Sequence, residues 1–121
     1  KHLSAISSEW QQQVGEGKTV QWPTGLGGGK NDGVAALVSQ NEGAIGYVEY
    51  GFSKMAGLPT AALENKSGQF IKASDESASA TLAAVTLPQN MRAFISDPEG
   101  GNSYPIVTYT WLLVYRERTR A

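Results

Sequence analysis

A glycine-rich loop is the part of this chain whose residue types could do chemistry. Residues 25–33 read Gly-Leu-Gly-Gly-Gly-Lys-Asn-Asp-Gly, and apolar residues at helical spacing follow over 34–38. The first N–H groups of a helix lack partners within it and carry partial positive charge, so a bare backbone at such an end can bind phosphate, sulfate or carboxylate. The loop is therefore a candidate anion contact.

Known nucleotide motifs do not fit this loop. A P-loop needs G-x-x-x-x-G-K followed by Ser or Thr, but Thr24 stands at its first glycine and Asn31 follows Lys30. The dinucleotide fingerprint G-x-G-x-x-G also fails, because Lys30 or Asp32 occupies its third glycine. Two interpretations stay open: a direct anion contact, or a glycine turn that lets a strand reverse into a helix.

The sequence shows no recognisable catalytic or metal-binding arrangement. His2, the only histidine, stands beside the first residue, where we expect a solvated side chain that takes no part in catalysis. Asp32 and Glu49 are the most suggestive pair of carboxylates, yet nothing in their spacing brings them together. The chain has no cysteine, which excludes thiolate catalysis and cysteine zinc sites. We predict no enzyme activity, no catalytic residue, no metal and no cofactor.

Composition limits the partners of the chain. At 121 residues it is about one domain, and 40% hydrophobic residues are enough for a modest core. Only 17% of the residues are charged and the net charge is −1, so no basic surface for nucleic acid is expected. Arg116, Arg118 and Arg120 are interrupted by other residues and are expected to form a solvated tail. No apolar run reaches the length of a membrane span.

The elements that must position the loop alternate between helices and strands. Apolar spacing, caps and stops predict helices over residues 3–6, 10–14, 31–40, 51–56 and 75–85. β-Branched and aromatic runs predict strands over residues 19–22, 44–48, 61–63, 69–72 and 106–115, with a hairpin turn at 65–68. The expected N-caps are Ser7 or Ser8, Asn31 or Asp32, and Ser74. This alternation predicts an α/β layered fold.

Burial of the aromatic residues and of the last strand follows from their neighbours. The aromatic side chains are expected in core or interlobe packing; they are Trp10, Trp22, Tyr47, Tyr50 and Tyr109. The 106–115 run is too uniformly apolar for a surface, yet only six residues follow it. Either earlier elements cover this run, or the chain is a piece of something longer, or another chain or copy covers the edge.

Several segments together carry a resemblance to a known family. They are 19–23, the 25–33 loop, 44–50, 64–68, 104–106 and 111–115, in the expected order over nearly the whole chain. The chain is similar to the second lobe of the phosphate-binding proteins of phosphate-specific ABC transporters, which are type II periplasmic solute-binding proteins. The resemblance implies an α/β lobe with a mixed central sheet flanked by helices, incomplete at both ends. Residues 1–105 would form most of this lobe, and residues 106–121 a crossover strand returning to the first lobe.

The resemblance also implies a function. Members bind inorganic phosphate between two lobes and deliver it to a membrane permease, in the periplasm or lipid-anchored at the outer face of a bacterial membrane. The family's arginine and Ser-Gly-Thr clamp would lie upstream of Lys1, so no direct phosphate ligand maps onto this chain. Gly28, Gly29, Lys30 and Asn31 would then support the cleft or line its rim.

The isolated chain is expected to bind phosphate weakly or not at all, because it supplies few of the donors needed.

Two rival functions remain beside phosphate binding. A self-associating interaction module would instead pair the 106–115 strand with another copy. A phosphate-ester enzyme using Asp32 or Glu49 is the third reading, and the missing metal and histidine sites disfavour it.

Overall fold

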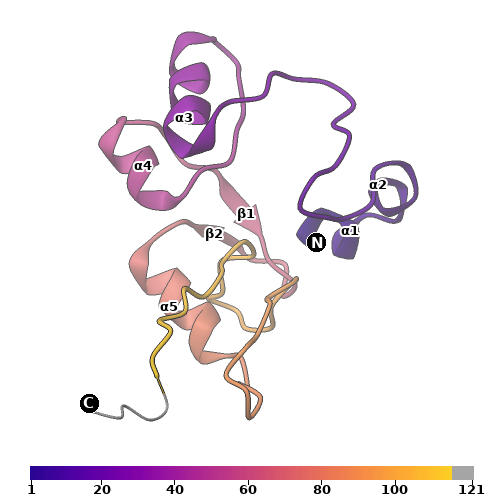
Figure 1. Ribbon diagram of the computed structural model, residues 1–121, viewed down its shortest axis with the longest axis vertical. Coiled ribbons are helices and arrows are strands. Elements are labelled where there is room, and N and C mark those ends of the chain that lie inside the picture. The colour runs from indigo at the N-terminus through magenta and orange to yellow at the C-terminus, as the bar shows by residue number, and fades with distance from the viewer. Residues whose placement is uncertain (116–121) are drawn as a thin grey trace.

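The structure is a computed structural model that describes residues 1–115. Within them are five helices and one hairpin (Figure 1). In chain order these are α1 (His2–Ile6), α2 (Ser8–Gln13), α3 (Lys30–Gln40), α4 (Tyr50–Met55), β1 (Ala62–Glu64), β2 (Phe70–Lys72) and α5 (Asp75–Ala83). Arg116, Arg118 and Arg120, expected as a solvated tail, lie outside the described residues.

The elements form three groups along the chain. Helices α1 and α2 pack together beside the N-terminus, and the irregular residues 14–29 lead from them to α3 (Figure 1). Helix α3 packs against α4, and the chain then enters the β1–β2 hairpin. Helix α5 follows directly after β2, and residues 84–115 continue without further regular structure. The glycine loop therefore enters the α3–α4 group.

Local capping signals placed two helices correctly. The Ser7 side chain accepts a hydrogen bond from the Trp10 N–H and so begins α2, and Ser74 accepts one from the Ser77 N–H and begins α5. Ser77 returns the bond to the Ser74 N–H, which completes a capping box. Glu49, expected only as the end of a strand, instead caps α4 by accepting from the Gly51 N–H. Each cap satisfies a helix N–H group that would otherwise lack a partner.

The hairpin is also where the sequence predicted it. Its two short strands are antiparallel, with Ala62 opposite Lys72, Leu63 opposite Ile71 and Glu64 opposite Phe70. The turn of residues 65–68 ends at Gly68, whose φ of 76° lies in the left-handed region that glycine adopts without strain. The hairpin prediction is confirmed.

Three predicted strands are wrong in this structure. Residues 19–22, 44–48 and 106–115 are irregular, and the described residues contain one two-stranded antiparallel sheet in place of the expected mixed central sheet. A strand persists only when a neighbouring strand accepts and donates its backbone hydrogen bonds. The described residues bring no such neighbour to these segments, so their β-forming composition alone did not make them strands.

The interior is polar rather than apolar. Among the hydrophobic residues of the described chain, only Ala35 is buried; the buried polar residues are Ser53, Asn65, Ser77, Thr81 and Ser103. Aromatic residues expected in a core are partly or largely exposed, with Trp22 at 50% and Tyr47 at 72%. Trp22 meets Trp10 edge to face and stacks on Tyr47, with ring centroids 5.3 and 5.9 Å away, and both Trp22 and Tyr47 lie at the surface.

Candidate functional site

The glycine loop is held against α3 by close backbone packing. A Cβ atom placed on Gly28 would lie 2.6 Å from the Val34 nitrogen and 2.7 Å from the Gly33 carbonyl carbon. Backbone atoms cannot move aside as a side-chain tip can, so only glycine fits at this position. Gly29 and Gly27 meet nothing within 4 Å. The bare backbone at Gly28 therefore serves the approach of the loop to the first turn of α3.

The N-cap of α3 differs from the sequence prediction. Gly29 occupies that position, with a φ of −72°, in place of Asn31 or Asp32, which lie inside the first turn. Lys30 adopts a φ of 58°, a left-handed conformation that is uncommon for a residue with a side chain. Since Gly29 has no side chain to donate or accept, the turn is closed by backbone, with the Gly33 N–H donating to the Gly29 carbonyl at 3.1 Å.

Asn31 ties the glycine loop to the next segment of the chain. Its Oδ1 accepts a hydrogen bond from the Glu49 N–H at 3.1 Å. Glu49 in turn caps α4, so this one contact fixes the loop relative to the α4 N-terminus. Of the four candidate residues, Gly28 and Asn31 thus have structural contacts, while Gly29 and Lys30 are exposed.

Asp32 and Glu49, the two carboxylates that the sequence suggested as a pair, have separate structural roles. The Glu49 Oε1 accepts from the Gly51 N–H at 2.9 Å, which uses it as a helix cap. Asp32 is exposed in the first turn of α3, where its charge complements the helix dipole. Residues 1–115 contain no group of three or more His, Cys, Asp or Glu side chains arranged to hold a metal ion.

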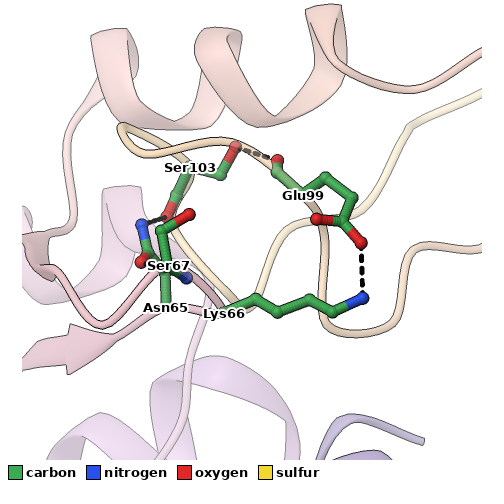
Figure 2. Close-up of polar contacts among 5 residues, drawn as sticks. All are labelled: Asn65, Lys66, Ser67, Glu99 and Ser103. Atoms are coloured by element: carbon green, nitrogen blue, oxygen red, sulfur yellow. Dashed lines mark hydrogen bonds and ion pairs between the residues drawn. The ribbon is translucent and has the colours of Figure 1, made fainter.

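A second polar site, which the sequence did not single out, lies at the hairpin turn. Asn65 is buried there, and its Nδ2 donates toward the carbonyls of Gly100, Gly101 and Ser103 at 3.2, 2.9 and 3.3 Å. Its Oδ1 accepts from the backbone N–H groups of Ser67 and Gln69 at 3.0 and 3.1 Å. One amide therefore closes its own turn and binds a loop 35 or more residues away (Figure 2).

That loop is folded back on itself by the same neighbours. Ser103 Oγ donates to the Glu99 carbonyl at 2.7 Å, and Figure 2 shows the Glu99 side chain reaching the Lys66 ammonium at the surface. The hydrogen bond and charge of Glu99 raise the pKa of Lys66. Gly100 has a φ of 109° and would bring a Cβ within 2.7 Å of Ser103 Oγ. Asn65, Glu99 and Ser103 thus form one closed unit, which we call the turn cluster together with Gly100 and Gly101.

Helix α5 is fastened to Tyr104, the residue that follows the turn cluster, through the hydroxyl group of Thr81. Thr81, fully buried, lies with its Oγ1 2.9 Å from the Ser77 carbonyl and 3.0 Å from the Tyr104 carbonyl. Ser77 Oγ donates to the carbonyl of Lys72 or Ser74, at 2.9 and 3.1 Å. Burial raises the pKa of the Tyr104 phenol. These donors are aimed at the chain's own carbonyls, so the cluster is a structural site.

A shallow hollow of about 350 Å³ lies at the start of α5. It is bordered by polar and apolar side chains; they are Ile71, Lys72, Ser74, Glu76, Ser77, Ala80 and Asn102. A hydrogen bond from its own N–H, and then one from Ser74, lower the pKa of Glu76, which keeps it charged at the helix N-terminus. This carboxylate already takes the place that a bound anion would need.

His2 is not the solvated residue that its position in the sequence predicts. It begins α1, and its Nδ1 is buried without a hydrogen-bond partner. Burial lowers the pKa of His2, the nearby Asp97 charge raises it, and the terminal ammonium lowers it. Lys1 lies over the Phe94 ring, with Nζ 4.9 Å from the ring centroid. The N-terminal residues therefore pack on the 94–97 segment, which explains why His2 is partly withdrawn from water.

Asn65 could have been recognised from the sequence as more than a turn residue. Asparagine at the first position of a four-residue turn that ends in glycine is a known signal for a side chain bonding its own backbone. The distant contacts to Gly100 and Gly101 leave no such local signal.

No helix within residues 1–115 combines the length and the hydropathy that a bilayer crossing requires.

Comparison with known proteins gives a consistent set of relatives. No family model matches the chain. It is 43% identical over 117 residues to the phosphate-binding protein PstS of Pasteurella multocida, 40% identical over 130 residues to that of Methanocaldococcus jannaschii, and 42% identical over 115 residues to that of Haemophilus influenzae. These matches cover 93 to 97% of this chain and 33 to 34% of each relative. The chain spans about a third of the length of these curated relatives.

Proposed function

Because this chain is homologous over nearly its whole length to a segment of the PstS phosphate-binding proteins, we propose that it is part of the second lobe of such a protein. The whole protein would bind inorganic phosphate and pass it to the permease of an ABC transporter, without chemical change. The observation that carries this proposal is identity of 38 to 43% across almost the entire chain in several relatives. Such similarity over so long a stretch supports a shared lobe fold of the type II solute-binding class.

The direct phosphate donors would come from residues other than these. Supporting this, the buried donors of the described chain are already committed to backbone carbonyls, as with Asn65 and Thr81. A phosphate site needs several donors converging on one open point, and leaving a charged ligand short of them costs affinity. The 121 residues alone would therefore bind phosphate weakly or not at all.

The glycine loop would border the phosphate cleft without touching the anion. Gly28 is used in packing on α3, and Asn31 binds the Glu49 backbone, so both have structural tasks that a rim position allows. Lys30 is exposed at the start of α3 and would add positive charge near the entrance. Its contribution would be to the rate of phosphate capture more than to the bound complex.

The proposed partners and location follow from this role. The ligand is inorganic phosphate and the protein partner is a membrane permease, with no nucleic acid and no cofactor involved. The site of action would be the periplasm, or the outer face of a bacterial membrane to which the protein is attached by lipid. No observation favours a phosphate-ester enzyme, since Glu49 is engaged as the cap of α4.

A chimeric protein tests the proposal directly. The matching third of the Pasteurella multocida relative is replaced by this chain, and phosphate binding is measured by calorimetry with sulfate as the competing anion. The chimera is expected to bind phosphate within about tenfold of the unmodified relative and to reject sulfate. A folded chimera that binds neither anion would overturn the proposal.

Two further arms separate the role of the loop from that of the lobe. Lys30→Ala in the chimera should leave the equilibrium affinity within about twofold while slowing association at low salt. Titration of the 121-residue chain alone should give no micromolar binding. Tight phosphate binding by the chain alone, or its loss in Lys30→Ala, would show that the anion is held within these residues.

A further inference from the structure

The chain is fastened to the body of the molecule just before it enters the 106–115 segment. Ser103 and Pro105 are buried, and Tyr104 between them is half-buried. Proline fixes its own φ and restricts the residue before it to extended backbone. The backbone of residues 103–105 is therefore covered by its surroundings and has few conformations open to it.

Two buried side chains from separate elements hold this stretch by its carbonyl groups. The Nδ2 of Asn65, in the hairpin turn, lies 3.3 Å from the Ser103 carbonyl oxygen (Figure 2). The Oγ1 of Thr81, in α5, lies 3.0 Å from the next carbonyl oxygen along the chain, that of Tyr104. Asn65 is 5% exposed and Thr81 is fully buried, so water does not compete for these contacts. We call Asn65 and Thr81 the exit anchor.

The attachment becomes weaker directly after Pro105. No backbone-to-backbone hydrogen bond within residues 1–115 involves residues 105–115. Ile106 and Thr108 are exposed, and the next contact with the body is one side-chain bond, from the Tyr109 hydroxyl to the Leu82 carbonyl at 2.7 Å. A change of direction over residues 106–108 therefore breaks no main-chain hydrogen bond, whereas a change at residues 103–104 would break buried ones.

We propose that the exit anchor is the fixed side of a hinge, and that residues 106–108 take up the change in backbone angles when the lobes of the whole protein close on phosphate. This inference rests on the proposed function, in which residues 106–121 cross to the first lobe. Hinges are a few residues at the ends of elements that absorb large φ and ψ changes. Asn65 and Thr81 would then be positioning residues, which decide where the bend occurs without touching the anion.

A firm anchor should strengthen phosphate binding by limiting the orientations that the open lobes can take. Closure on the ligand selects one orientation, and each alternative that must be given up costs affinity. An anchor that opens adds alternatives to the open form, so it should favour release. The first encounter of phosphate with the open cleft does not involve these residues, and the association rate should stay the same.

Amide exchange in the 121-residue chain tests the anchor itself. Thr81→Val keeps the shape of the side chain and leaves the Tyr104 carbonyl without this donor. Protection factors of the Ser103 and Tyr104 amides should fall by about fivefold, as for one net hydrogen bond, and Thr81→Ser should retain them. Ser53→Ala is the matched control, because its buried hydroxyl donates to the Tyr50 carbonyl at 2.8 Å within α4. It should leave both amides unchanged.

Phosphate binding by the chimera with the Pasteurella multocida relative tests the hinge. Thr81→Val should raise the dissociation constant by roughly fivefold through faster release, with the association rate within about twofold. Thr81→Ser and Ser53→Ala should leave both quantities unchanged. The measurements are made well below the melting temperature, where a loss of stability alone leaves the affinity of the folded protein as it was.

The outcomes separate this inference from the proposed function. Unchanged protection of Ser103 and Tyr104 in Thr81→Val, equal losses in Ser53→Ala, or an unchanged dissociation constant in a chimera that binds phosphate would each overturn the hinge anchor. A chimera that binds no phosphate before any of these substitutions overturns the proposed function instead, and the exchange result then decides by itself whether Thr81 anchors the chain.

Discussion

The glycine loop and the hairpin turn are held in place by opposite means. The glycine loop lies against α3 because Gly28 has no side chain, and one exposed hydrogen bond from the Glu49 N–H to Asn31 joins it to α4. The hairpin turn is held by the buried amide of Asn65, which contacts two backbone groups of its own turn and three of the distant 100–103 loop. The first depends on close backbone approach, and the second on satisfied polar atoms.

This difference shows where the stability of the described chain lies. When an exposed hydrogen bond is lost, water can replace it. When a buried amide is lost, the carbonyls that it bonded are left without a donor. With Ala35 as the only buried hydrophobic residue among those described, the turn cluster replaces part of the missing apolar core. Conformational change in the glycine loop should therefore be tolerated better than any change at Asn65.

Replacing the two asparagines by leucine is the strongest test of this comparison. Asn65→Leu keeps the approximate volume but removes all the hydrogen bonds of the Asn65 side chain, and we expect a loss of about 3 kcal/mol in unfolding free energy. Asn31→Leu removes one exposed bond and should cost about 1 kcal/mol or less. Urea denaturation measures both, and amide exchange at Ser67 and Gln69 should accelerate only in Asn65→Leu.

An Asn65→Asp variant separates the contacts of Asn65 to its own turn from those to the 100–103 loop. It keeps an acceptor for the Ser67 and Gln69 N–H groups but turns a charged oxygen toward the carbonyls of the 100–103 loop. We expect protection to persist in the turn while the distant loop is released. Equal loss of stability in Asn65→Leu and Asn31→Leu would contradict the comparison.

Adjacent glycines provide the second test, on the side of the glycine loop. Gly28→Ala would place a Cβ 2.6 Å from the Val34 nitrogen, so the loop must move away from α3, at a cost of about 2 kcal/mol. Gly29→Ala is the matched control, because its φ of −72° suits alanine and nothing lies within 4 Å of the new Cβ. It should cost only roughly 0.3 kcal/mol, as an N-cap change.

Circular dichroism and thermal melting follow both glycine variants. If Gly28→Ala has the same melting temperature as Gly29→Ala, then the loop does not depend on close approach at Gly28 and its glycines have another role. A selective loss in Gly28→Ala would confirm that the glycine run is at least partly a packing device.

The parts of the fold that could be predicted are those specified by neighbouring residues. Ser7 and Ser74 as caps, and the turn ending at Gly68, depend on atoms within four residues, so the sequence pattern contains all the partners. The α3 cap was missed because the helix begins at Lys30, which has a left-handed backbone, and its N-cap is Gly29, a residue with no side chain to signal a cap. Asn65 was recognised only as a turn residue, since its contacts to Gly100 and Gly101 span 35 and 36 positions.

The strand predictions failed for a related reason. Composition records whether a residue can join a sheet, but hydrogen bonding to another strand decides whether it does. Residues 44–48 and 106–115 have β-forming side chains and no neighbouring strand among the described residues. That they would join a central sheet in a longer phosphate-binding protein, with residues 1–105 as a lobe and 106–121 crossing out of it, stays a prediction.

The smallest expected effect is a loss of stability at low pH, on the side of the molecule that contains the turn cluster. His2 packs near Asp97, two residues before Glu99, and burial lowers its pKa below the ordinary value of about 6.5. The unfolded chain therefore takes up this proton more readily than the folded chain. The stability that neutral His2 provides is fully present above pH 6.5 and is lost as the pH falls from there through the lowered pKa.

Proton NMR can follow this group without ambiguity, because His2 is the only histidine. Its titration midpoint should lie below 6.5, and Asp97→Asn should lower it further by removing the charge that raises it. Amide protection factors near residues 94–97, which correct for the intrinsic slowing of exchange in acid, should fall slightly between pH 7 and 5, while those of the glycine loop stay unchanged, and His2→Gln should remove this pH dependence. A midpoint at or above 6.5, or one that rises in Asp97→Asn, would mean that the N-terminal residues are not packed on the 94–97 segment, and that the turn cluster stands without their support.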